Sequence, residues 1–547
     1  MYKITRVCVI WMTLSLAASA AQAAAVAPDA ILFNGKIFTS AQGQSYVQAL
    51  AVQGDRIQAV GDSEQIKRLA GPGTKQIDLD GRTVIPGLND AHNHLGISPA
   101  GTVRLDFGKD PARSDAEAAI AAAERKSSPD AILVGAIGLS LFKDVHLNRM
   151  ELDRVAPTHP VILTTFTGHA CILNSAALGR FGIHEDQQDF PGARFERGTD
   201  GKLTGVLREY ARFIVRRRLA EQTTDEDGVK QLRNDLSEAL LFGITTIQDM
   251  ANVIPPDRAV RLLEQAQIPI RVRVMRMPLV SSAGRNLSEG QNMPKSVGDY
   301  IRVSGTKWML DGTPFEGTYA ARTDDSPPDM LFVHLGMTFP SEELKKMLRE
   351  SLSSGDQILF HVSGYPAAKA LLKAMEDTGG SVEWAKRRVR MEHGDGLFPD
   401  LRTQARELGV VVVQNPQHFV GLPPPLMQRM EKMGAQPLKS LLRAGIPVAL
   451  GSDDEMNPYL DIMLAASHPN NPSEAITREQ AVLAYTLTSA FAEFAEKDKG
   501  ELQPGKLADL AVLSQDIFTV PMRELPKTRS VMTMVGGRIV YDPKLLP

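Results

Sequence analysis

Four short apolar runs that carry metal-ligand residues constrain the fold of this chain most. The runs are VIPGLNDAHNH, ILFHV, RVRMEH and PVALGSD, and they carry His92 and His94, His361, His393 and Asp453. Short apolar runs bounded by turn residues are typical of buried parallel strands. Because an α/β barrel gathers its functional residues at the C-terminal ends of its strands, the sequence predicts a barrel with a metal site at that end.

A count of strand patterns supports the barrel. Most of the patterns are separated by one amphipathic helical pattern, which favours a (β/α)8 TIM barrel over an open sheet. The count requires that residues from about 98 to 228 form an insertion after barrel strand 1. An alternative places two strand patterns of that segment, AILVGAIG and PVILTTFTGHACIL, in the barrel itself. The eight patterns are VIPGLNDAHNH, ITTIQDM, PIRVRVMR, KWMLDG, ILFHV, RVRMEH, VVVQN and PVALGSD.

Helix-capping signals occur between these strand patterns. Ser341 is a candidate N-cap of the helical pattern that ends at Gly355, and Thr477 with Gln480 forms a capping-box pattern. These signals indicate helices on the outside of the barrel.

Both ends of the chain have sequence patterns that are typical of a small β domain. The chain has 547 residues, beyond the roughly 250–300 residues at which single cores stop growing, so two or more domains are expected. Turn dipeptides such as Asn34-Gly35 and Gly536-Gly537 separate short strand patterns at both termini. We predict an α/β protein with a composite β-sandwich of residues 28–84 and 500–547 around a barrel of residues 85–499. The alternative is two unrelated β appendages.

The N-terminus resembles a secretory signal peptide. Lys3 and Arg6 precede an apolar stretch, and Ala21-Gln22-Ala23 is a candidate cleavage site. Residues 1–24 are therefore predicted to be removed from an exported protein, periplasmic or secreted; the alternative is a membrane anchor. Cys8 would leave with the signal, and Cys171 would remain without an internal disulfide partner.

Composition excludes some classes of partner. A net charge of −3 gives no electrostatic case for nucleic acid binding. No stretch after the signal is long and apolar enough to cross a bilayer, so no membrane contact is expected after signal removal. A small-molecule substrate is the expected partner, and homo-oligomerisation stays open.

The histidine pairs predict divalent metal binding. His92 and His94 lie two apart on one strand, so both can reach one ion, and imidazole nitrogens bind Zn²⁺ at about 2.0–2.1 Å. His361 and His393 end two other strands. Asp453 ends the strand beside the first in a closed barrel, as a ligand or a proton carrier. Zn²⁺ is the first candidate, although these ligands also suit Mn²⁺ and Fe²⁺. The other seven of the 11 histidines, including His418, are not predicted to be metal ligands on the basis of their position.

Lys307 begins the fourth strand pattern, KWMLDG. A lysine that points into a barrel among divalent ions has to be neutral or converted to a carbamate, whose two oxygens can bridge two metals. The alternative is a surface or salt-bridged lysine. Asp311, just after it, is either part of a strand-end turn or an element of the site.

The ordered motifs resemble the amidohydrolase superfamily, and most closely its family-3 branch (YtcJ-like, N-substituted formamide deformylase-like). They extend from about residue 30 to 540. The chain departs from the branch pattern in DGTPFEGTYAA and GSDDEMNP, which weakens inferences about the substrate. The motifs are VIPGLNDAHNH, TGHACILNSAAL, GKLTGVLREYA, FGITTIQDM, KWMLDGT, FHVSG, MEHGD, GSDD and GELQPGKLADLAVL.

The resemblance implies roles for individual residues. His92 and His94 would hold one metal and His361 and His393 a second, although the family contains one-metal and two-metal members. Lys307 would be a bridging N6-carboxylysine, and Asp453 would contact the metal and carry the proton as the catalytic residue. Glu209 is the other candidate bridge or a substrate contact. Candidate substrate-binding residues are His169, Asn174, Glu209 and Asp311.

These observations predict an exported metal-dependent hydrolase of C–N bonds in linear or cyclic amides, acting by attack of metal-bound hydroxide. An ester or lactone hydrolase is an alternative, because the same nucleophile attacks either carbonyl. A secreted binding or regulatory protein without catalysis is the alternative from another class. It would be expected to have lost part of the ligand set, and all five strand-end ligands are present.

Overall fold

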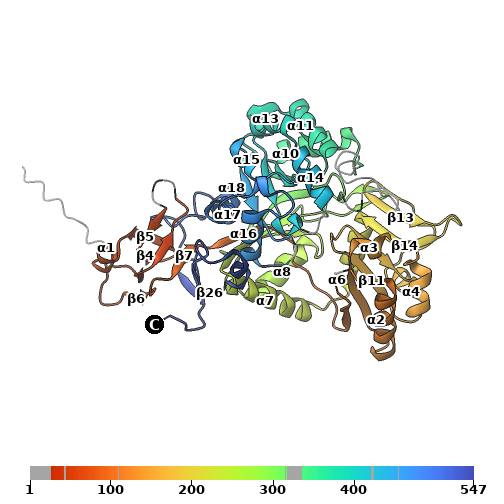
Figure 1. Ribbon diagram of the computed structural model, residues 1–547, viewed down its shortest axis with the longest axis horizontal. Helices are drawn as coiled ribbons and strands as arrows, with labels where there is room; N and C mark the ends of the chain where they lie inside the picture. Colours follow the sequence, from red (N-terminus) through yellow and green to blue (C-terminus); the bar gives the residue numbers. More distant parts are fainter. Residues whose placement is uncertain are drawn as a thin grey trace, which may run out of the picture.

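Three bodies lie side by side along the longest axis of the protein. The computed structural model describes residues 26–546 except residues 42, 44, 109, 315, 317–335, 421–423 and 454. A small β domain lies at one end, a barrel in the middle and a sheet with helices at the other end (Figure 1). The predicted signal peptide and part of the departing DGTPFEGTYAA segment lie outside the described residues.

The barrel contains the eight predicted strands in the predicted order, each parallel to its neighbour, which confirms the predicted fold class. Between the last strand and the first, Asp90 accepts hydrogen bonds from the Ser452 backbone N–H (2.9 Å) and hydroxyl (2.6 Å). The strands are nearly all buried, as expected for a sheet covered on both faces. They are β8 (Leu88–Asn93), β15 (Ile244–Ala251), β16 (Arg271–Arg276), β20 (Ile301–Met309), β21 (Ile358–Val362), β22 (Arg390–His393), β23 (Val411–Gln414) and β24 (Val448–Leu450).

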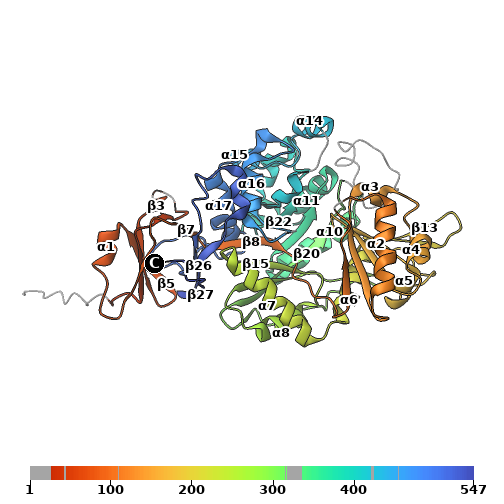
Figure 2. The ribbon, with the colours of Figure 1, turned by 60° about the horizontal axis from the view of Figure 1, so that its bottom comes forward.

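Helices surround this barrel (Figure 2). The predicted capping box is present, since the Thr477 hydroxyl accepts from Gln480 N–H and the Gln480 side chain accepts from Thr477 N–H. The cap predicted at Ser341 is wrong by one residue: Pro340 is the N-cap and Ser341 starts the helix. No helix of the described residues has the length and apolar character needed to span a bilayer. The helices include α7 (Asp225–Leu241), α8 (Pro256–Ala266), α10 (Ser341–Ser354), α11 (Tyr365–Thr378), α13 (Pro399–Glu407), α16 (Pro458–Ser467), α17 (Arg478–Tyr485) and α18 (Leu487–Ala492).

The two ends of the chain share one sheet of the small domain. The N-terminal strand β7 (Thr83–Pro86) pairs with the C-terminal strand β25 (Leu510–Leu513). A facing sheet is formed by β1 (Ala30–Phe33), β4 (Ala49–Gln53), β5 (Arg56–Gly61) and β6 (Lys75–Asp78). The composite domain therefore has one core, to which both termini contribute. The remaining strands are β2 (Lys36–Phe38), β3 (Tyr46–Val47), β26 (Ser530–Val535) and β27 (Arg538–Tyr541).

The insertion after β8 forms its own six-stranded sheet, so the alternative that assigned two of its strands to the barrel is wrong. The last strand of the insertion runs directly into helix α6 (Tyr210–Glu221), which lies near the barrel (Figure 2). Arg208 donates to the carbonyl oxygen of Glu316 (2.8 Å), which joins the insertion to the barrel side. The sheet strands, in spatial order, are β13 (Ala193–Arg197), β14 (Leu203–Glu209), β12 (Ala170–Leu173), β11 (Val161–Thr165), β10 (Ile132–Ile137) and β9 (Thr102–Leu105).

Candidate active site

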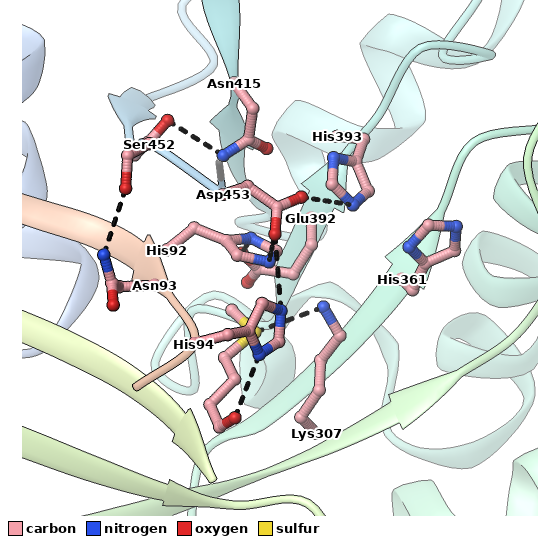
Figure 3. Close-up of polar contacts among 12 residues, drawn as sticks. His92, Asn93, His94, Lys307, His361, Glu392, His393, Asn415, Ser452 and Asp453 are labelled. Atoms are coloured by element: carbon pink, nitrogen blue, oxygen red, sulfur yellow. Dashed lines mark hydrogen bonds and ion pairs between the residues drawn. The ribbon is translucent and has the colours of Figure 1, made fainter. Parts of the chain in front are cut away.

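The predicted ligand residues meet at the C-terminal end of the barrel. His92, His361 and His393 lie at or near the ends of β8, β21 and β22, while Asp453 follows β24. Strand β20 begins at Ile301, earlier than the motif KWMLDG, and so Lys307 also lies near the C-terminal end of its strand. Figure 3 shows these side chains around one space.

His92, His94 and Asp453 form the tightest group. The Nε2 atoms of both histidines lie 3.3 Å from the same carboxylate oxygen, Oδ1 of Asp453. The Nδ1 atoms are engaged elsewhere: that of His92 lies 2.8 Å from Glu392 Oε2, and that of His94 lies 3.0 Å from the Met250 carbonyl oxygen. A partner at Nδ1 fixes the ring orientation and directs Nε2 toward a metal.

Glu392 is itself held in place. Arg390 reaches it with Nε and Nη2 at 2.8 and 3.0 Å, and both side chains are fully buried. Burial opposes ionisation of Glu392, but the positive charges of Arg390 and Lys307 outweigh it and hold its pKa well below the ordinary range. The carboxylate is therefore ionised and orients His92.

The second histidine pair lies beside the first. The His393 ring centroid is 5.1 Å from that of His92 and 4.6 Å from that of His361. Burial lowers the pKa of His361 and of His393 well below the ordinary histidine value, so both rings are neutral, the state that binds metals. The buried Nδ1 of His393 has no hydrogen-bond partner among the described residues.

His418 is a potential ligand that the sequence pattern missed. It lies in the short 3-10 helix η1 (Pro416–Phe419) after β23, and its Nε2 is 3.7 Å from Asp453 Oδ2. His393 Nε2 is 3.8 Å from the same oxygen, so His393, His418 and Asp453 form a second compact group. The sequence signal that could have identified His418 is its position just beyond the end of a strand.

Lys307 is buried in the middle of the site, with 2% of its surface exposed. Its Nζ lies 3.4 Å from the thioether sulfur of Met250, a weak acceptor. Burial lowers its pKa to about 8 despite the nearby carboxylates. The alternative of a surface or salt-bridged lysine is therefore wrong, since no ion pair of Lys307 occurs within the described part of the chain.

The predicted substrate-binding residues have different surroundings. His169 lies beside the site, with its ring centroid 4.7 Å from that of His361 and its Nδ1 2.9 Å from Glu209 Oε2. Asp311 accepts the backbone N–H groups of Ser363 and Gly364, and burial raises its pKa to about 8.

Asn174 is held by the backbone. Its Oδ1 caps helix α5 (Ser175–Arg180) at Ala177 N–H and also accepts Val161 N–H, while its Nδ2 donates to the carbonyl oxygens of Ala156 and His159. The amide is thus committed to the structure of the insertion, and Asn174 is not among the residues that line the cavity.

A cavity of about 430 Å³ opens above the ligand residues. One wall is the barrel end, with His92, His94, Lys307, His361, His393 and Asp453. The insertion contributes residues 164–169 and the arginines Arg212 and Arg216 of α6, and helix α7 contributes the carboxylates Asp235 and Glu238. The volume lies within the range of small-molecule sites.

Comparison with known proteins identifies the family. The sequence model of the amidohydrolase family (Amidohydro_3) matches residues 75–541. The chain belongs to the amidohydrolase family. Family membership confirms the predicted resemblance and assigns the protein to the metal-dependent hydrolases that act on C–N bonds.

Two curated relatives and one solved structure cover nearly the whole amidohydrolase chain. Protein LONG AFTER FAR-RED 3 of Arabidopsis thaliana is 26% identical over 97% of this chain and 94% of its own. N-substituted formamide deformylase of Arthrobacter pascens is 26% identical over 94% of this chain and 98% of its own. The crystal structure of an uncharacterized metal-dependent hydrolase from Pyrococcus furiosus, 22% identical, has a TM-score of 0.65 and covers 90% of this chain and 100% of that chain; it supports the fold.

The residues of this amidohydrolase site fit a divalent metal. Their donors are imidazole nitrogens and a carboxylate, which suit Zn²⁺ and similar ions. The Nε2 atoms of His92 and His94 converge while their Nδ1 atoms are occupied, and the buried Nδ1 of His393 lacks a partner. A bound ion would satisfy these donors.

Proposed function

We propose that this protein is an exported hydrolase of amide-type C–N bonds in small molecules, with one or two divalent ions, Zn²⁺ first among them. The observation that carries the proposal is the approach of two oriented histidines to one oxygen of Asp453, at 3.3 Å each. The similarity to N-substituted formamide deformylase supports an amide over an ester substrate.

In this proposal His92 and His94 would hold one ion, and His361 and His393 would hold a second. A bound ion would activate water and polarise the substrate carbonyl. Asp453 is placed to accept the proton of the attacking water and to pass it to the leaving amine, because one of its oxygens faces His92 and His94 and the other faces His393. The cavity walls limit the water around the substrate.

The experiment that tests the function is hydrolysis of a panel of N-formyl and N-acyl amines, cyclic amides and matched esters. We expect amide hydrolysis that chelation abolishes and that Zn²⁺ or Mn²⁺ restores. Metal content is measured by mass spectrometry alongside. Protein that retains no divalent metal, or that hydrolyses only the esters, would contradict the proposal.

We further propose that Lys307 is carboxylated and that its carbamate oxygens would serve as ligands to both ions. Its buried Nζ has no carboxylate partner within 4 Å among the described residues, and only a thioether lies beside it. A neutral amine that adds CO₂ and releases a proton becomes a carbamate with two metal-binding oxygens. Glu209, the other candidate bridge, is held by His169 and does not line the cavity.

Isotope labelling tests the carbamate. Metal-loaded protein equilibrated with ¹³C-bicarbonate is expected to give a carbamate carbonyl signal by NMR, and Lys307→Arg is expected to lack it. Lys345→Arg, a surface replacement, serves as the control and should keep the signal. A wild-type protein with two bound metals and no carbamate signal would refute the assignment.

Export is proposed from the N-terminal sequence. Lys3, Arg6 and the apolar stretch that follows match a signal peptide, and Ala23 precedes the expected cleavage site. N-terminal sequencing of the protein from periplasmic or secreted fractions is expected to start at Ala25, after removal of residues 1–24. An uncleaved chain that stays with the membrane would favour an anchor.

A further inference from the structure

Two arginines of helix α6 line the same cavity as the ligand residues. Arg212 and Arg216 lie four residues apart, and therefore on one face of the helix. Both contribute to the same cavity as His92 and Asp453. The Arg212 guanidinium lies against the loop at Gly168. Its Nη2 is 3.6 Å from the position that a Cβ atom would take at Gly168.

Neither arginine has a hydrogen-bond or ion-pair partner in the described part of the chain. Arg212 is only 6% exposed, and its buried Nε is unpaired. The guanidinium carbon of Arg212 lies 5.6 Å from the centroid of the Phe213 ring, a cation–π contact. The next arginine of the helix differs: Arg217 reaches the carboxylate of Glu289 and the carbonyl oxygen of Asn252. Buried charges without partners are costly, and proteins usually avoid them.

The carboxylates whose charges act on these arginines are engaged by other groups. Glu209 accepts from His169, and Glu316 accepts from the Thr167 hydroxyl. Asp249 accepts from the Leu95 N–H, and Asp453 faces His92 and His94. Burial, together with the nearby charge of Arg212, lowers the pKa of Arg216 to about 9. Because arginine stays protonated in proteins, this repulsion is a cost that a bound anion would relieve.

We infer that Arg212 and Arg216 bind a carboxylate of the substrate, so that the preferred substrates are amides that carry a carboxylate a few bonds from the scissile C–N bond, such as N-acylated amino acids. This inference rests on the proposed function. The planar guanidinium group matches a carboxylate with two parallel hydrogen bonds. The ligand residues and the arginines line one cavity, so one small molecule can contact both groups at once.

Matched substrates test the inference. The probes are the N-formyl and N-acetyl derivatives of both enantiomers of leucine and phenylalanine, each as the free carboxylate and as the neutral primary amide. For the wild type we expect kcat/KM to be higher for the carboxylates. Arg212→Gln and Arg216→Gln should each lower it about 10- to 100-fold for the carboxylates, the worth of a charged hydrogen bond, and less than about threefold for the amides. Arg218→Gln, on the exposed side of the same helix, is the matched control and should change neither series.

Binding provides a second readout that does not need turnover. Calorimetry with metal-free protein and the same carboxylates is expected to give an affinity that both variants lose and that the control keeps. Thermal unfolding of Arg212→Gln should occur at the wild-type temperature or above it, because an unpaired buried charge has been removed. If Arg212→Gln does not fold, Arg216→Gln still decides, since Arg216 is only partly buried.

The outcomes separate the two proposals. Equal losses for the carboxylate and amide series, or a wild-type preference for the amides, would overturn the inference and leave the hydrolase proposal intact. Tighter binding of the corresponding phosphonates would overturn the assignment to a carboxylate. If no member of either series is hydrolysed, the amide hydrolase proposal fails for these substrates, while calorimetry still decides whether the arginines bind the carboxylate.

Discussion

Asp453→Asn is expected to lower kcat for amide hydrolysis by about 100- to 10,000-fold, the usual contribution of a positioned proton carrier. Asparagine keeps the shape of the side chain but cannot accept the proton of the attacking water. The neighbours of Asp453 also hold its pKa well below the ordinary range: burial opposes this shift, and His92 and His94 outweigh it. The wild-type carboxylate is therefore ionised and able to accept a proton.

Loss of metal has to be separated from loss of the base. Steady-state rates are measured at saturating metal, with the metal content of each sample determined in parallel. Asp461→Asn is the matched control, because Asp461 is a buried carboxylate of helix α16 that accepts the Tyr485 hydroxyl and does not line the cavity. Full activity of Asp453→Asn with a normal metal content would show that another group carries the proton.

The largest expected effect on stability comes from Arg390→Met. Arg390 pairs with Glu392 on β22, and also donates to Gln248 of β15 and to the Ala91 carbonyl oxygen of β8, both at 2.6 Å. Its removal leaves Glu392 buried without its main counter-charge. Breaking a buried pair in this way costs about 3–5 kcal/mol in the free energy of unfolding.

Denaturant unfolding of the metal-free protein measures this effect. The double variant Arg390→Met/Glu392→Gln removes both charges and is expected to recover much of the lost stability, because a neutral amide is cheaper to bury than a carboxylate. A single variant within about 1 kcal/mol of the wild type would mean that Glu392 has another source of compensation.

The order of strands and the main candidate ligands could be predicted from sequence because they depend on local patterns. Apolar runs located the eight strands, and two-residue spacing placed His92 and His94 on one side. Glu392 was not predicted as a site residue. Side chains alternate along a strand, so if His393 faces the site, its neighbour Glu392 should point away from it. His393 has a φ of +69°, a left-handed conformation that redirects the chain at the strand end, so both neighbours reach the centre.

Long-range contacts explain the remaining gaps. The approach of His418 to Asp453 depends on η1, and the turn after β23 gives no residue pattern that fixes it. The arginines of α6 face the cavity only because the insertion folds back over the barrel. Asn174 belongs to a motif that resembles a substrate segment, but its four hydrogen bonds to the backbone could be counted only with coordinates.

The pairing of β7 with β25 also has a consequence for how the chain is made. A ribosome releases β7 hundreds of residues before its partner strand, and β7 leads through Gly87 straight into β8, which carries His92. Until residues 510–513 emerge, the edge of β7 that pairs with β25 stays unpaired, and β7 is the segment that leads into the first barrel strand. A premature stop before Leu510 would therefore damage a catalytic centre from which no residue had been deleted.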